Sequence, residues 1–291
     1  MLMEWKYGHT AYTVHGDLTS GKTPLIILHG GPGFGSKGAT AVAGYALSTG
    51  RPVVVYDQIG CGDSSALLEK PKEFWQVPIF VEEFNALVNH LRIADNFALI
   101  GQSWGGLLAA EIAITQPAGL KALILSSALG DTQTWLDEVR RLVLEMPKEI
   151  ADVIIKHEEA GTTDSQEYLV AAYKFYDRHV IRIPMPADFA AHFEEAMAQP
   201  NVYHSMWGHS ELTCTGTLSG HIVTDRLHKI KVPTLVISGK YDESTPKTSQ
   251  AFIREIPNSH WEIFEESGHC SFLEEAAKYQ RVMNDFLQTN T

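Results

Sequence analysis

Short apolar runs recur along the chain, each bounded by glycine, proline or aspartate. Six of them occupy residues 24–28, 52–56, 97–100, 120–125, 234–237 and 261–264. Most are continuous and rich in valine, isoleucine and leucine, which is typical of strands buried on both faces of a parallel sheet. Stretches with helical spacing lie between them, at 81–91 and at 107–115, the second ending before Pro117. This alternation predicts a doubly wound α/β sheet.

The alternation stops between residues 129 and 229, where the chain is helix-like, rich in aromatic residues and poor in strands. The strand pattern resumes at Val232. The closing strands still need the same sheet, so this segment is predicted to be an insertion over the carboxyl edge of the sheet. We therefore expect a catalytic core at 1–128 and 230–291, with a helical lid, or cap domain, at 129–229.

Composition and charge narrow the class of protein. With 44% hydrophobic and 20% charged residues, the 291-residue chain is ordinary for a globular protein. Met1 to Lys6 hold no signal-peptide pattern, and no apolar run approaches the roughly 20 residues of a membrane span. A cytoplasmic protein is expected. The net charge of −12 argues against nucleic acid or an anionic membrane as a partner.

The run Gly101-Gln102-Ser103-Trp104-Gly105 matches the nucleophile elbow G-x-S-x-G. A predicted strand precedes it and a small-residue helix follows, which is the context that the motif requires. In such a turn the serine backbone is strained, and a side chain at either glycine would clash. Ser103 is therefore predicted to be the nucleophile of a serine hydrolase with an α/β-hydrolase core.

A nucleophilic serine needs a base and an acid that orients it, and in this fold they follow in the order Ser, acid, His. Asp242 comes after the strand at 234–237, and His269 comes after the strand at 261–264. Both occupy the loop positions that the order requires. Asp225 and Glu243 are alternatives for the acid, but neither is as well placed relative to the end of a strand.

Two backbone N–H groups should form an oxyanion hole. One is that of Trp104, the residue after the nucleophile. The other should come from the run His29-Gly30-Gly31-Pro32-Gly33, which follows a strand and is similar to the glycine-rich element of esterases. We assign it to Gly31, because glycine permits the backbone angles that direct an N–H group at the oxyanion.

Two further motifs point to nucleotides and are set aside. Residues 16–23 match the P-loop pattern, but Pro24 and a strand follow where a phosphate site needs a helix. We interpret this segment as a hairpin turn between two strands. Residues 33–38 spell G-x-G-x-x-G, with only Asp57 as a candidate ribose ligand. No paired histidine spacing suggests a metal, and three scattered cysteines suggest reduced thiols. No cofactor is expected.

Taken together, the motifs resemble the proline iminopeptidases, a family of aminopeptidases within the α/β-hydrolase superfamily. The resemblance covers nearly the whole chain except the early lid, at 132–198. The matching segments are 29–33, 56–64, 101–106, 201–217, 232–246 and the segment that contains His269.

The resemblance implies release of an N-terminal residue, often proline, from short peptides or amides with a free N-terminus. It places acids that would hold the free amino group at Glu211 and Glu243, where charge-assisted hydrogen bonds would select an ammonium. Tyr203 and Trp207 could line an apolar slot for the first side chain, or simply form the core of the lid. His209 departs from the proline expected beside Ser210, which leaves the side-chain preference open. The alternative function is an amino-acid amidase or esterase of the same fold, with no peptide role.

Overall fold

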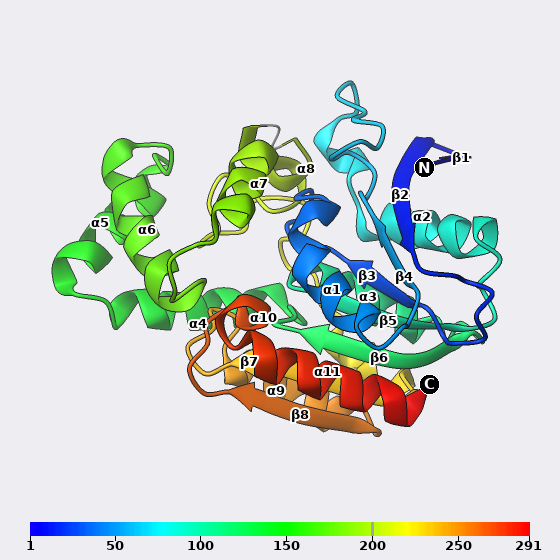
Figure 1. Ribbon diagram of the computed structural model, residues 1–291. Helices are drawn as coiled ribbons and strands as arrows, with labels where there is room; N and C mark the ends of the chain where they lie inside the picture. The colour runs from blue at the N-terminus through cyan, green and yellow to red at the C-terminus, as the bar shows by residue number, and fades with distance from the viewer. Residues whose placement is uncertain (199–200) are drawn as a thin grey trace.

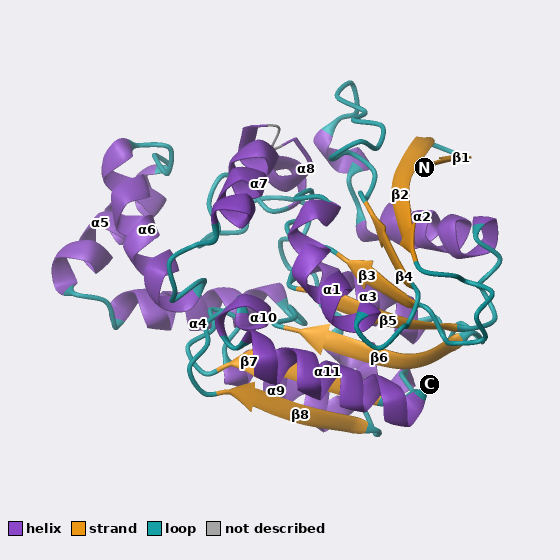
Figure 2. Cartoon of the chain, in the orientation of Figure 1, coloured by secondary structure: helices purple, strands orange, loops and turns teal. Residues whose placement is uncertain are grey.

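The fold is an eight-stranded sheet flanked by helices, as drawn in Figures 1 and 2. It is described here from a computed structural model, which covers residues 1–198 and 201–291. In chain order the strands are β1 Leu2–Trp5, β2 Gly8–His15, β3 Leu25–Leu28, β4 Val53–Tyr56, β5 Phe97–Gln102, β6 Leu120–Ser126, β7 Thr234–Gly239 and β8 Ser259–Phe264. Their spatial order is β1-β2-β4-β3-β5-β6-β7-β8.

The strands from β4 to β8 pair in parallel, whereas β1 and β2 form an antiparallel edge. The predicted α/β-hydrolase fold class is confirmed. The prediction of a hairpin at residues 16–23 is wrong, because β2 pairs with β4 and not with β3. That segment is a connection between strands that are not neighbours in the sheet. It leads directly into β3, so it is not followed by the helix that a phosphate cradle needs.

Strands such as β3 are apolar at every position because a hydrophobic core lies against each face of the sheet. In β3, Leu25 and Ile27 join the core beneath α1 Thr40–Leu47 and α11 Ala276–Asn290. Ile26 and Leu28 join the opposite core, which is covered by α2 Val77–His90 and α3 Trp104–Ile114. Because successive side chains of a strand point to opposite faces, a strand buried on both sides has no polar positions.

The remaining helices of the core connect or follow its strands. They are the short helices η1 Ser36–Ala39 and η2 Lys72–Phe74, together with α9 Pro246–Glu255 and α10 Ser271–Glu274. The short helix η3 Thr224–Lys229 lies at the end of the segment between β6 and β7. The three cysteines are free, as predicted. None of the helices within the described ranges is both long and apolar enough to cross a membrane.

Between β6 and β7 the chain is helical, as the sequence predicts. Its helices are α4 Thr132–Leu144, α5 Lys148–Ala160, α6 Gln166–His179, α7 Ala187–Ala198 and α8 Asn201–Met206. Figure 1 shows α5 and α6 standing away from the sheet, whereas α7 and α8 lie closer to α1. Side chains that accept backbone hydrogen bonds fix two of the helix starts, Asp131 for α4 and Ser165 for α6.

Candidate active site

Ser103 lies at the sharp turn between β5 and α3, with φ 57° and ψ −122°. A side chain at either flanking glycine could not be accommodated. A Cβ atom on Gly101 would lie 2.0 Å from the Gly105 carbonyl oxygen, and one on Gly105 would lie 2.2 Å from the Leu28 carbonyl oxygen. The strained serine is held by its neighbours, and its side chain lines a cavity at the carboxyl edge of the sheet.

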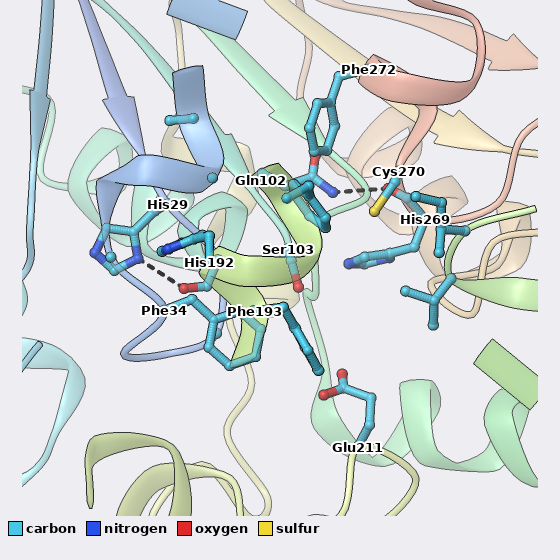
Figure 3. Close-up of a pocket in the computed structure, with 18 of the residues that line it drawn as sticks. His29, Phe34, Gln102, Ser103, His192, Phe193, Glu211, His269, Cys270 and Phe272 are labelled. Carbon is cyan, nitrogen blue, oxygen red and sulfur yellow. Dashed lines mark hydrogen bonds between the residues drawn. The ribbon is translucent and has the colours of Figure 1, made fainter. Parts of the chain in front are cut away.

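Asp242 and His269 meet beside this serine. Asp242 follows β7 and is 1% exposed, and its Oδ1 atom lies 2.7 Å from Nδ1 of His269. The Ser244 N–H group donates to the same oxygen at 2.7 Å, which fixes the carboxylate. Figure 3 shows the His269 ring pointing toward Ser103. The alternative acid Asp225 lies in η3, with a side chain that is 67% exposed.

The backbone of His269 is anchored by groups that the sequence does not reveal. The carbonyl oxygen of His179, at the end of α6, accepts hydrogen bonds from the N–H groups of His269 (3.0 Å) and Glu243 (3.3 Å). The carbonyl of His269 in turn accepts from Gln102 Nε2 at 2.9 Å and from Ser127 Oγ at 3.1 Å. A residue of the helical segment between β6 and β7 thus joins the two loops that carry Asp242 and His269.

Gly31 and Trp104 both line a small cavity that also contains Ser103 and His269. Gly31 has φ 114°, which favours glycine, and a Cβ atom on Gly30 would lie 3.4 Å from Cβ of Ser103. The loop at 29–33 therefore lies against the serine. This is where the predicted oxyanion donors would have to lie.

Gln58, which no motif in the sequence singled out, connects Trp104 to the loop at 29–33. Its Oε1 atom accepts from Trp104 Nε1 at 2.8 Å, and its Nε2 atom donates to the His29 carbonyl at 3.1 Å. Its own N–H donates to His29 Nε2 at 3.0 Å. Burial lowers the pKa of His29 to about 4, so the ring is neutral at pH 7 and Nε2 can accept this bond.

Two glutamates converge near His269 from different parts of the chain. Glu243 is 1% exposed; its Oε1 atom lies 4.0 Å from His269 Nδ1, and its Oε2 atom has no hydrogen-bond partner among the described residues. Glu211 accepts a hydrogen bond from the Tyr203 hydroxyl, and its carbonyl accepts from Trp207 Nε1 at 3.1 Å. Tyr203 and Trp207 are thus buried supports of Glu211, and each also lines a cavity at Ser103.

Burial is the main cause of the shifted pKa values of Glu211 and Glu243. Burial raises the pKa of both carboxyl groups, and for Glu243 the nearby Glu211 charge raises it further. Burial acts to lower the pKa of His269, but Asp242, Glu243 and Glu211 outweigh it and raise this pKa to about 9. Burial thus disfavours the charged forms of the two glutamates, and a cation bound between them would stabilise those charged forms.

The structure brings all nine predicted site residues together. Ser103 and seven of the others line the cavities at the serine, and Asp242, the ninth, is hydrogen-bonded to His269. No group of histidine, cysteine and acidic side chains in the described part of the chain could hold a metal ion. The chemistry that this arrangement permits is nucleophilic attack beside a bound cation, within a cavity of about 240 Å³.

Known proteins match this chain over nearly its full length. Residues 23–276 match the family described as the alpha/beta hydrolase fold. A proline iminopeptidase of Clostridium botulinum is 38% identical over 282 residues, covering 97% of this chain and 95% of that protein.

Two crystal structures are also closely similar. That of VinJ is 42% identical with a TM-score of 0.96, covering 100% of this chain and 98% of the other. That of proline iminopeptidase from Mycobacterium smegmatis is 39% identical with a TM-score of 0.93, covering 99% of this chain and 97% of the other. The chain therefore belongs to the proline iminopeptidase family of the α/β-hydrolase superfamily.

Proposed function

We propose that this chain is a serine aminopeptidase that releases an N-terminal residue, preferably proline, from short peptides or amides by way of an acyl-enzyme. The observation that carries this proposal is the pair of glutamates beside the histidine, with Glu243 Oε1 at 4.0 Å from His269 Nδ1. A hydrolase of neutral esters has no use for two desolvated carboxylates at this position, because each costs free energy to bury without a cation.

In the proposed reaction His269 takes the proton of Ser103 while the serine oxygen attacks the carbonyl carbon of the first residue. Asp242 orients the imidazole, and the N–H groups of Gly31 and Trp104 stabilise the oxyanion. The C–N bond then breaks, and the proton passes from His269 to the leaving amine. Water, activated by the same histidine, attacks the ester and releases the free amino acid.

Glu211 and Glu243 hold the substrate ammonium in this scheme. Proline has a secondary ammonium with two N–H donors, so each carboxylate can accept one of them. Substrates with a blocked amine lose both bonds and leave two buried acids unpaired. The preference for proline is supported by two similar proteins, the proline iminopeptidases of Clostridium botulinum and Mycobacterium smegmatis, at 38% and 39% identity.

The division of the chain is part of the same proposal. Residues 129–229 form a lid that supplies Glu211, Tyr203 and Trp207, while 1–128 and 230–291 supply the nucleophile, the histidine and its acid. A lid with this role closes over the amino group of the substrate and excludes water from the acids.

The deciding experiment compares prolyl, alanyl and leucyl p-nitroanilides with their N-acetyl analogues and with p-nitrophenyl acetate. Cleavage of the free-amine anilides and rejection of the blocked ones is expected, together with complete loss in Ser103→Ala. Equal rates on blocked and free substrates would instead support an esterase or amidase without a peptide role.

A further inference from the structure

The cavity at Ser103 extends well past the two glutamates. We call it the chamber, and its walls come from η1, α1, α6, α7 and the segment from Cys270 to Tyr279. Its lining includes Val42 on α1 and Tyr279 on α11, both within the core between the sheet and these helices. A chamber of this depth has room for more than the first residue of a substrate.

The wall of the chamber is apolar. Phe34 packs edge-on against Phe193 with ring centroids 5.6 Å apart, and Phe189 lies 6.1 Å from Phe272. The apolar character continues to the mouth, where Leu169 and Met185 are each 39% exposed and Tyr173 is 56% exposed. Large apolar side chains gathered at a cavity mouth are typical of a surface that receives an apolar ligand.

The chamber offers a carboxylate no side chain of lysine or arginine. Among its described lining residues there is neither lysine nor arginine. Lys37, beside the wall residue Gly38, is exposed and paired with Glu195 at 2.6 Å. Arg182, beside Ile181, stacks on Tyr241 with its guanidinium carbon 3.7 Å from the ring centroid.

The buried imidazoles of the chamber offer a carboxylate little more. His269 is the one that carries a charge, with its pKa raised to about 9, and its Nδ1 atom is already paired with Asp242 at 2.7 Å. Burial lowers the pKa of His192 as it does that of His29, so both rings are neutral at pH 7. A carboxylate placed here would meet apolar walls and the charges of Glu211 and Glu243. Such a ligand would lose its hydration and gain no partner.

We propose that the chamber binds the leaving side of the substrate, and that the enzyme prefers aminoacyl amides of uncharged, apolar amines to dipeptides that end in a carboxylate. The inference rests on the proposed aminopeptidase function. In this arrangement the substrate ammonium lies at the glutamates and the carbonyl lies at Ser103. The group beyond the scissile C–N bond must then extend away from the glutamates, into the chamber. In Figure 3, Phe34 and His192 lie on the side of Ser103 opposite His269.

The overall reaction adds one water to the amide and gives the free amino acid and the free amine. The proton of Ser103 passes through His269 to the leaving nitrogen, and no further reactant is needed. An apolar amine therefore leaves the chamber as a product that becomes protonated in water.

The first test uses the unaltered enzyme and proline n-alkylamides from methyl to hexyl. Each added CH2 group should raise kcat/KM about three- to fourfold until the chamber is filled. Pro-Leu amide should be cleaved about tenfold or more faster than Pro-Leu, which carries the free carboxylate. A flat alkyl series, or equal rates on Pro-Leu and its amide, would overturn the proposal.

The second test separates the leaving side from the first residue. Phe193→Ala should flatten the alkylamide series at fixed proline, while the ratio of prolyl to alanyl p-nitroanilide should stay within about twofold. Glu194→Ala, an exposed neighbour on the same helix, is the matched control. Thermal melting checks that both variants are folded. A change in the first-residue ratio with an unchanged alkylamide slope would overturn the assignment of the chamber.

Failure of this inference can be told apart from failure of the proposed function. Labelling of Ser103 by a fluorophosphonate and cleavage of proline p-nitroanilide test the function alone. If both succeed and the alkylamide series is flat, only the chamber proposal falls. If neither free-amine anilides nor alkylamides are cleaved, the aminopeptidase proposal falls and the chamber assignment falls with it.

Discussion

Glu243 Oε1 lies 4.0 Å from Nδ1 of His269, the same nitrogen that is bonded to Asp242 at 2.7 Å. Two buried carboxylates thus act on one imidazole, and Glu211, from the segment between β6 and β7, acts on it as a third. Together they raise the pKa of His269 to about 9 against the opposing effect of burial. With this pKa the imidazole is largely protonated at pH 7 in the ligand-free site, whereas the role of base that we propose for it requires the neutral form.

A bound cation should therefore activate the histidine. We expect the rate of Ser103 labelling by an uncharged fluorophosphonate to rise with pH and level off above the His269 pKa of about 9. Pyrrolidinium, which places a positive charge at the glutamates, should move this rise to lower pH. An unchanged profile at saturating pyrrolidinium would contradict the electrostatic coupling.

Glu243→Gln should move the same labelling profile to lower pH without any added cation, because one of the charges that stabilise the imidazolium is gone. Glu265→Gln is the control, since Glu265 is exposed and paired with Lys240 at 2.9 Å. Identical profiles for the two variants would show that Glu243 does not act on His269.

Glu211→Ala should raise KM for proline p-nitroanilide by about 100-fold, because a charge-assisted bond to the ammonium is lost. KM for p-nitrophenyl acetate, which has no amine, should change by less than about threefold. Tyr203→Phe removes the hydroxyl that donates to Glu211 and should give a smaller effect in the same direction. Steady-state kinetics on both substrates test this role. An equal rise in KM for the two substrates would show that Glu211 has a structural role and does not bind the ammonium.

Gln58→Leu should lower kcat by about 10-fold or more with little change in KM. The amide links Trp104 Nε1 to the loop that carries Gly31, so its loss misplaces groups that act on the oxyanion. It also leaves buried polar atoms without partners, at a cost of about 1–3 kcal/mol in the free energy of unfolding. A change confined to the melting temperature, with kcat intact, would restrict Gln58 to a structural role.

Gly101→Ala should prevent the elbow from forming, since its Cβ atom would lie 2.0 Å from a backbone oxygen that cannot move away. We expect severe loss of stability or no folded protein, measured by melting and by yield of soluble chain. Gly44→Ala is the matched control, because no atom within 4 Å would meet its Cβ and it lies inside α1. That variant should be stabilised by up to about 1 kcal/mol.

Several features could be predicted because each depends on local chemistry. Continuous apolar runs such as 24–28 imply a strand buried on both sides, and the two cores beside β3 bear this out. The glycines around Ser103 imply a turn with no room for side chains, which the contacts at Gly101 and Gly105 show directly. The connection at 16–23 could not be judged in this way, since the pairing of β2 with β4 joins residues that are 38 to 44 positions apart, from His15 with Val53 to Tyr12 with Tyr56.

The fold class, and the residues that gather at Ser103, could be predicted from short segments of the chain. Strand burial, glycine at tight turns and the order of the loops are properties of short segments, and they can be read one segment at a time. How these groups act on one another depends on the folded chain. The 4.0 Å between Glu243 and His269, the link through Gln58 and the apolar chamber all join segments far apart in the chain. Electrostatic and packing energies depend on distance in space, which spacing along the sequence does not specify.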